Sequence, residues 1–99
     1  MLRPVINSKV QRIDDSVCES RFDNCLVLFH RESGAYYNFN RIWGELWEWL
    51  KTPRQIDELA SMLSTRYACT QDQCRPDIVI WLENMAAEGL IKVMYCVEL

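Results

Sequence analysis

The sequence is poor in the residues that most catalytic and metal sites require. Its 99 residues include one histidine, three glycines and three prolines, and the five cysteines form no Cys-x-x-Cys pair. There is no glycine-rich phosphate loop, and a zinc site would need Cys69, Cys74 and a distant third ligand. His30 is the only general-base candidate that titrates near neutral pH. It ends a strand just before a turn, where a structural role is the simpler interpretation.

The serines and the paired carboxylates add no catalytic pattern. No serine lies in a Gly-x-Ser-x-Gly turn, and the pairs Asp14–Asp15 and Asp57–Glu58 fall in polar segments where solvated side chains are expected. We therefore predict a non-catalytic binding domain without a cofactor or a resident metal.

Long apolar runs and an excess of positive charge are missing as well. No run of about 18 apolar residues is present to span a membrane, and the first residues lack the apolar centre of a signal peptide. The formal net charge of −3 gives no overall attraction to nucleic acid or to anionic lipid. We expect a cytoplasmic protein with free thiols, and with neither nucleic acid nor a membrane as its partner.

The sequence does contain enough apolar material for one small core, with 49% hydrophobic and 11% aromatic residues. Residues 1–8 include a proline and show no periodicity, so we expect a flexible arm there and a single domain over residues 9–97. Lys9–Ile13 has the alternation of a half-buried strand. Asp14–Asn24 is polar and acidic, and we predict a connection or a weak strand end.

A β-hairpin followed directly by a helix is the strongest local pattern. Cys25–Phe29 is an apolar run of strand-forming residues, Arg31–Gly34 supplies the turn, and Ala35–Phe39 resumes with three aromatic residues. Asn40 stands where the period changes from 2 to 3.6, so its side chain is predicted to cap a helix over Arg41–Lys51. If the preceding strand pairs with this hairpin, the three strands form one antiparallel sheet.

The helix at 41–51 carries more apolar surface than one packing face needs, so we expect it to contact two surfaces. Gly44 in its interior weakens it by about 1 kcal/mol relative to alanine, and the close approach of another backbone explains the glycine best. The apolar residues of this helix are Ile42, Trp43, Leu46, Trp47, Trp49 and Leu50.

A second helix is predicted from a capping signal and from apolar periodicity. Thr52, Pro53 and Gln55 have the spacing of a capping box with proline at the first helical position. The residues expected to face the core, at i, i+3, i+4 and i+7, are Ile56, Leu59, Ala60 and Leu63.

A third helix is predicted over Gln71–Glu88, with Thr70 in a second capping box. Pro76 lacks a backbone N–H, so we expect either a distorted first turn or a start delayed to Arg75. Gly89 is predicted to end the helix in the left-handed conformation. The residues expected to face the core are Ile78, Leu82 and Met85, with Trp81 flanking them.

The predicted order of elements defines the fold class. A three-stranded antiparallel sheet followed by three helices, and by a short strand or tail at Ile91–Val97, is an α+β fold of the winged helix-turn-helix type. Such folds often bind DNA, which makes a transcription regulator the first alternative. The third helix opposes it, because four acidic residues accompany a single arginine there.

Segments spread over two thirds of the chain, from Leu26 to Val93, follow the order of a known family. They are LVLF at 26–29, SGAYYNFN at 33–40, Ile42-Trp43, Leu46, PRQIDEL at 53–59, Cys74-Arg75, Asp77-Ile78, Trp81-Leu82 and Glu88-Gly89-Leu90-Ile91. In this order they resemble the PqqD family, the recognition elements for precursors of ribosomally synthesised and post-translationally modified peptides (RiPPs).

The resemblance implies a winged-helix-like domain that binds the leader segment of a precursor peptide and presents it to maturation enzymes. In that family the leader adds as an antiparallel strand to a sheet edge and lies against the third helix. The peptide-binding residues that the resemblance implies for this chain are Ala35, Tyr36, Tyr37, Asn38, Phe39, Asp77, Ile80, Trp81 and Asn84.

The implied partners are the leader peptide and an enzyme that acts on it: a leader peptidase, an ATP-dependent cyclase or a radical-SAM protein. The chain resembles the free-standing members that accompany lasso-peptide maturation more than the pyrroloquinoline-quinone members. It lacks the characteristic strand sequences of the latter between Val10 and Phe29. A structural subunit that forms a homodimer through the tryptophan-rich helix is a second alternative.

Overall fold

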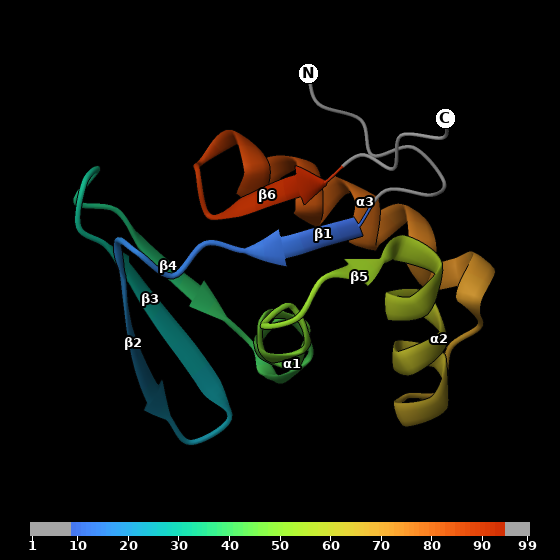
Figure 1. Cartoon of the computed structure of the whole chain (residues 1–99). Coiled ribbons are helices and arrows are strands. Elements are labelled where there is room, and N and C mark those ends of the chain that lie inside the picture. Colours follow the sequence, from blue (N-terminus) through green and yellow to red (C-terminus); the bar gives the residue numbers. More distant parts are fainter. Residues whose placement is uncertain (1–8, 95–99) are drawn as a thin grey trace, which may run out of the picture.

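The computed structural model describes residues 9–94, which form an α+β fold with two three-stranded antiparallel sheets and three helices. Figure 1 shows the β2-β3-β4 sheet as a wing on one side of the molecule, with α2 on the opposite side and α1 between them. The elements are β1 (Lys9–Arg12), β2 (Val17–Phe22), β3 (Cys25–His30), β4 (Tyr36–Phe39), α1 (Arg41–Trp49), β5 (Arg54–Gln55), α2 (Ile56–Arg66), α3 (Gln71–Ala87) and β6 (Ile91–Met94).

The predicted class is confirmed, with a three-stranded sheet, three helices after it and a short C-terminal strand. The predicted arm at 1–8, and residues 95–97 of the predicted last segment, lie outside the described residues.

The wing consists of two successive hairpins, and its first strand differs from the prediction. β2 pairs with β3 from Val17 opposite His30 to Phe22 opposite Cys25, so the segment predicted as a connection or a weak strand end contains a full strand. The two-residue turn between them holds Asp23 at a φ of 54°, which aspartate tolerates better than most residues. β2 escapes sequence prediction because almost all of its side chains are exposed, which leaves it without an apolar face.

Strand β1 does not pair with the hairpin, so the predicted composition of the sheet is wrong. β1 lies between β5 and β6 in the second sheet, and it pairs with β6 from Lys9 opposite Met94 to Arg12 opposite Ile91. The physical reason is that β2 occupies the edge of the hairpin beside β3, whereas β6 gives β1 a partner along its whole length in the second sheet. Val10 and Ile91 are instead buried within the common core.

Arg12 links the second sheet to the wing and to α1. Its guanidinium lies 2.7 Å from Asp14, 3.7 Å from Glu19 of β2 and 3.9 Å from Glu48 of α1. It also lies 5.1 Å from the centroid of the Trp47 ring. Trp47 is completely buried and donates its indole N–H to Glu19 at 3.0 Å. These contacts hold the wing in place. They also keep Trp47 in the interior, where it cannot form part of a dimer interface.

Helix α1 begins directly where β4 ends, as predicted. Asn40 Oδ1 accepts a hydrogen bond from the N–H of Trp43 at 3.1 Å. The helix ends at Trp49 rather than at Lys51. A Cβ placed on Gly44 would lie 3.5 Å from the side-chain Cβ of Leu26 in β3, an ordinary van der Waals contact. The predicted close approach of another backbone is therefore not what explains this glycine.

The start of α2 differs from the prediction. Arg54 and Gln55 form β5 and pair with β1, so the helix begins only at Ile56, and its capping box joins Gln55 to Glu58. Pairing with β1 keeps these two residues extended and thereby overrides the local helix signal at Thr52. The predicted core residues Leu59, Ala60 and Leu63 are buried.

Helix α3 begins at Gln71 and is not delayed to Arg75. Thr70 Oγ1 accepts from the N–H of Gln73 at 3.2 Å, and Gln73 Oε1 accepts from the N–H of Thr70 at 3.0 Å. Both halves of the capping box are therefore formed, and Pro76 is accommodated inside the helix. The predicted core residues Ile78, Leu82 and Met85 are buried.

The predicted cap at the end of α3 is confirmed. Gly89 has a φ of 76°, its N–H donates to the carbonyl of Ala86, and the N–H of Leu90 donates to the carbonyl of Met85 at 2.9 Å. This left-handed turn reverses the chain and leads β6 back beside β1.

Candidate functional site

Strand β4 is the outermost strand of the wing, so one of its edges has no partner among residues 9–94. The N–H of His30 donates to the carbonyl of Ala35 at 2.9 Å. This bond fixes the phase of the β3–β4 ladder, because bonded and non-bonded pairs alternate along antiparallel strands. Along the observed register, the backbone groups of Tyr37 point toward β3. Those of Tyr36 and Asn38 point to the free edge.

The side chains of β4 alternate between the core and solvent. Phe39 is buried and Tyr37 is half-buried on the inner face, whereas Asn38 and Tyr36 are exposed on the outer face, Tyr36 by 69%. The ring of Tyr36 packs on Phe29 of β3 with their centroids 4.8 Å apart. The strand is thus held by its inner side chains while its edge stays open, as strand addition by a peptide requires.

A shallow hollow of about 250 Å³ lies on α3 and is lined by Trp43, Asp77, Ile80, Trp81 and Asn84. The structure therefore brings together the four helix residues that the sequence placed at the site, and it adds Trp43 from α1. Ile80 is 59% exposed, so a large apolar side chain is left in solvent beside the hollow.

Trp81 connects the hollow to β4 and to α1. Its ring meets that of Phe39 edge-on at 5.5 Å between centroids, and it stacks on Trp43 at 5.3 Å with an interplanar angle of 17°. The side chain packs against the core, and its buried indole N–H has no acceptor among the described residues. Trp81 is both a packing residue and a wall of the hollow, which places the hollow next to β4.

Tyr37 reaches from β4 to the C-terminal end of α3. Its hydroxyl donates to Glu88 Oε2 at 3.0 Å, and Glu88 is the C-cap residue of the helix. Burial, followed by the hydrogen bond to this carboxylate, raises the pKa of Tyr37 above its ordinary value. The phenol therefore stays a donor at neutral pH. Together with the contact of Phe39 and Trp81, it attaches β4 to α3 at two points.

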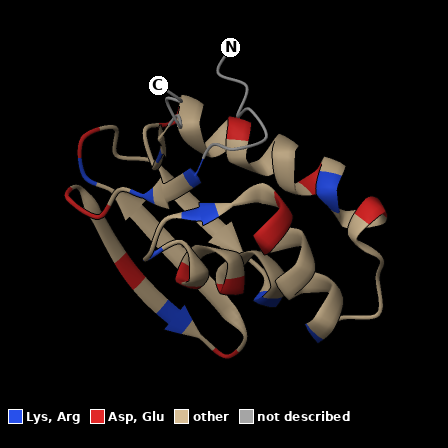
Figure 2. Ribbon diagram, turned by 45° about the vertical axis from the view of Figure 1, so that its right-hand side comes forward, with Lys and Arg blue, Asp and Glu red and all other residues tan. Residues whose placement is uncertain are grey.

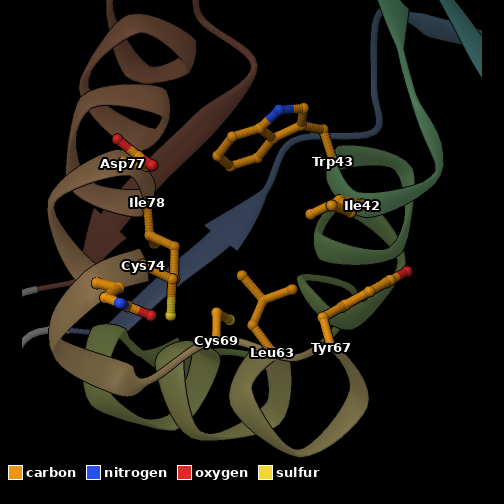
Figure 3. Close-up of a pocket in the computed structure, with 9 residues that line it drawn as sticks. Ile42, Trp43, Leu63, Tyr67, Cys69, Cys74, Asp77 and Ile78 are labelled. Atoms are coloured by element: carbon orange, nitrogen blue, oxygen red, sulfur yellow. The ribbon is translucent and has the colours of Figure 1, made fainter.

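A more enclosed pocket lies beside the hollow, between α1, α2 and the start of α3 (Figure 3). Its volume is about 270 Å³, and it shares Trp43 and Asp77 with the hollow. The sequence did not predict this pocket, because its wall joins three helices. The other lining residues are Ile42, Leu63, Tyr67, Cys69, Gln73, Cys74 and Ile78.

Ala35, the first residue of the predicted peptide-binding strand, lies in the hairpin turn. Its N–H donates to Ser33 Oγ at 3.3 Å and its carbonyl accepts from His30, so both backbone groups are used inside the hairpin. The free edge therefore begins at Tyr36. His30 is itself buried, with Nδ1 at 2.9 Å from Ser33 Oγ, and so braces the same turn.

The charges on α3 are unsuited to a phosphate backbone. Arg75, its one arginine, is paired with Asp57 at 2.9 Å and with Asp72 at 3.1 Å. Figure 2 shows the other basic residues scattered over the molecule rather than gathered on one face. Within residues 9–94 no three His, Cys, Asp or Glu side chains come together to hold a metal ion, and no helix is long and apolar enough to cross a membrane.

The sequence matches the family model of coenzyme PQQ synthesis protein D (PqqD) over residues 25–91. The match spans about two thirds of the chain, from the start of β3 to the first residue of β6. The chain belongs to the PqqD family. No curated protein matches it.

Two solved structures share the fold. TbiB1 in complex with the TbiA(beta) leader peptide is similar with a TM-score of 0.74 and 21% identity, covering 88% of this chain and 100% of that chain. Lasso peptide synthetase B1 complexed with the leader peptide is similar with a TM-score of 0.72 and 17% identity, covering 84% and 96%. At such identities the likeness establishes a common fold.

Proposed function

We propose that this protein binds the leader segment of a ribosomally synthesised precursor peptide and presents it to the enzymes that mature the peptide. The observation that carries the proposal is the free edge of β4, where the N–H and C=O groups of Tyr36 and Asn38 point away from β3. The leader adds there as an antiparallel strand, and alternate side chains of the leader face α3.

The backbone contacts alone are too few for tight binding. Four main-chain hydrogen bonds contribute about 2–6 kcal/mol in total, whereas micromolar affinity requires about 8 kcal/mol. The remainder comes from the hollow, where Ile80 and Trp81 offer apolar contact and Asp77 and Asn84 offer polar groups.

The role is that of an adaptor rather than an enzyme. A leader peptidase, an ATP-dependent cyclase or a radical-SAM protein acts on the peptide that this protein holds. The proposal is supported by the two similar structures, since both of those proteins were solved with a leader peptide.

Hydrogen–deuterium exchange tests the site. The ligand is a synthetic leader taken from a short precursor reading frame beside the gene. We expect the bound peptide to slow exchange at Tyr36–Phe39 and around Asp77–Asn84, because strand pairing and burial protect those amides. A scrambled leader is the control. Protection confined to β1 or to α1 would contradict the proposed site.

A further inference from the structure

Two cysteines flank the capping box that starts α3. Thr70 is the N-cap residue, Cys69 precedes it, and Cys74 is the fourth residue of the helix. In helices of this kind the side chains at these two flanking positions often pack on each other as a hydrophobic staple. In this chain both positions of the staple carry a thiol.

Both thiols line the pocket between α1, α2 and α3 (Figure 3). Both cysteines are half-buried, so a small molecule in solvent can reach them. Cys74 Sγ also lies 3.8 Å from the carbonyl oxygen of Ala60 in α2. Burial, followed by a hydrogen bond with Cys69, raises the pKa of the Cys74 thiol.

The other described cysteines have no such neighbour. Cys18 lies opposite Phe29 and Cys25 lies opposite Phe22, so the two are four register positions apart along the wing. At about 3.4 Å per residue this separation exceeds the Cα–Cα distance of about 4.4–6.8 Å that a disulfide allows. Cys96 lies outside the described residues.

We propose that Cys69 and Cys74 form a dithiol site that a small-molecule disulfide, such as oxidised glutathione, converts to an intramolecular disulfide. The Cys69 thiol loses its proton to solvent, and its thiolate attacks the small disulfide to form a mixed disulfide and release one thiolate. Cys74 then loses its proton and attacks the Cys69 sulfur, which forms the protein disulfide and releases the second thiolate. Two protein thiols are oxidised while one small disulfide is reduced to two thiols. The raised pKa of Cys74 favours Cys69 as the first attacking group.

The bond changes the wall of the pocket. It brings the two sulfur atoms to a bonding distance of about 2.0 Å in a pocket whose wall includes Trp43 and Asp77, which also line the hollow on α3. As a second step of the proposal, we expect oxidised protein to bind the leader several-fold more weakly than reduced protein. This second step rests on the proposed function.

The variant Cys18→Ser/Cys25→Ser/Cys96→Ser keeps just the two thiols and is tested beside the wild-type protein. After treatment with oxidised glutathione and digestion by trypsin without reduction, peptide 67–92 should be lighter by two hydrogen atoms. Both cysteines fall in this peptide because the bond after Arg75 precedes proline and resists trypsin. The oxidised protein should also melt several degrees higher, since the closed loop restricts the unfolded chain.

The matched controls add Cys69→Ser or Cys74→Ser to that variant, and each should retain a glutathione adduct instead of losing two hydrogens. Recovery of both cysteines as thiols, or as two separate adducts, would overturn the dithiol site. Equal leader affinity in both redox states overturns the second step alone. Failure of the reduced protein to bind any leader would contradict both the proposed function and the second step. The mass of peptide 67–92 would still test the dithiol site, because that measurement involves no leader.

Discussion

Tyr37 and Asn38 are adjacent in β4, yet their backbone groups point in opposite directions, which allows a residue-by-residue test of the edge. Asn38→Pro removes an N–H that faces solvent, and an edge strand tolerates proline there. We expect this variant to stay folded and to lose leader binding. Tyr37→Pro removes an N–H that bonds to β3, and we expect it to unfold the wing. Circular dichroism and fluorescence anisotropy with a labelled leader measure the two effects.

The control for this pair is Asn38→Ser, which keeps the N–H and changes only an exposed side chain. It should bind the leader as the wild type does. Full leader affinity in a folded Asn38→Pro protein would show that the peptide does not pair with this edge.

Trp81 and Ile80 are neighbours in the hollow that differ in burial, which separates binding from stability. Trp81→Ala removes an indole that stacks on Trp43 and meets Phe39 edge-on. It should cost about 1–3 kcal/mol of binding and also lower the melting temperature. Ile80→Ala removes a mostly exposed side chain and should weaken binding with little change in melting temperature. Isothermal titration and thermal melts of both variants are the measurements. If Ile80→Ala binds normally while Trp81→Ala only melts earlier, the hollow is a packing feature.

At the scale of elements, the helices are predictable from sequence because each carries a buried face with a period of 3.6. Leu59, Ala60 and Leu63 are buried as their spacing predicts, and Gly89 ends α3 in the left-handed region. β2 lacks such a face, and β1 finds its partner β6 at the far end of the chain. Tertiary pairing also moved the start of α2 past Thr52. Local pattern therefore predicts the helices, while long-range pairing decides the sheets.

The candidate site is likewise predictable from sequence only in part. The edge strand and the helix wall follow from local patterns and from the family resemblance, and the structure places Asp77, Ile80, Trp81 and Asn84 around one hollow. Trp43 of α1 joins them by stacking on Trp81 of α3. The bond of Tyr37 to Glu88 also joins residues far apart in the sequence. No spacing in the sequence signals either contact.

Glu48 joins α1 to the wing, and its ionisation should make stability depend on pH. Burial alone would raise the pKa of Glu48, but the hydrogen bond with Lys51 and the charges of Arg21, Lys51 and Arg12 outweigh it, so the pKa lies below the ordinary 4.5. Because the pKa is lower in the folded state than in the unfolded state, the ionised carboxylate stabilises the protein at pH values above the unfolded-state pKa. This stabilisation disappears as the pH falls through the folded-state pKa.

Glu48→Gln should therefore lower the melting temperature near neutral pH. The difference from the wild type should shrink once the pH falls below about 4.5. Thermal melts of both proteins across this range measure it, with Glu83→Gln as the control, since no ion pair of Glu83 is found among the described residues. A difference that stays constant down to low pH would show that the carboxylate acts by shape rather than by charge.

For the whole molecule, the distribution of charge predicts no specific affinity for DNA. The net charge is −3, and Arg75 of α3 is already paired with two aspartates, so contact with phosphates would release few counterions. Mixing the protein with duplex DNA at moderate salt should give no sequence-specific retardation on a gel. A specific shift at submicromolar protein would instead favour a transcription regulator.

The free edge of β4 is also short, and under the proposed function its length sets how much of a precursor the protein can read. Two outward-facing residues pair with two residues of an incoming strand and skip the one between them, a span of about 7 Å. Sliding the peptide by one position turns its side chains to the wrong face, and sliding it by two loses half of the pairing. Recognition is thereby confined to a brief motif in fixed register. The sequence beyond that motif, including the part that becomes the product, is free to diverge without a change in this protein.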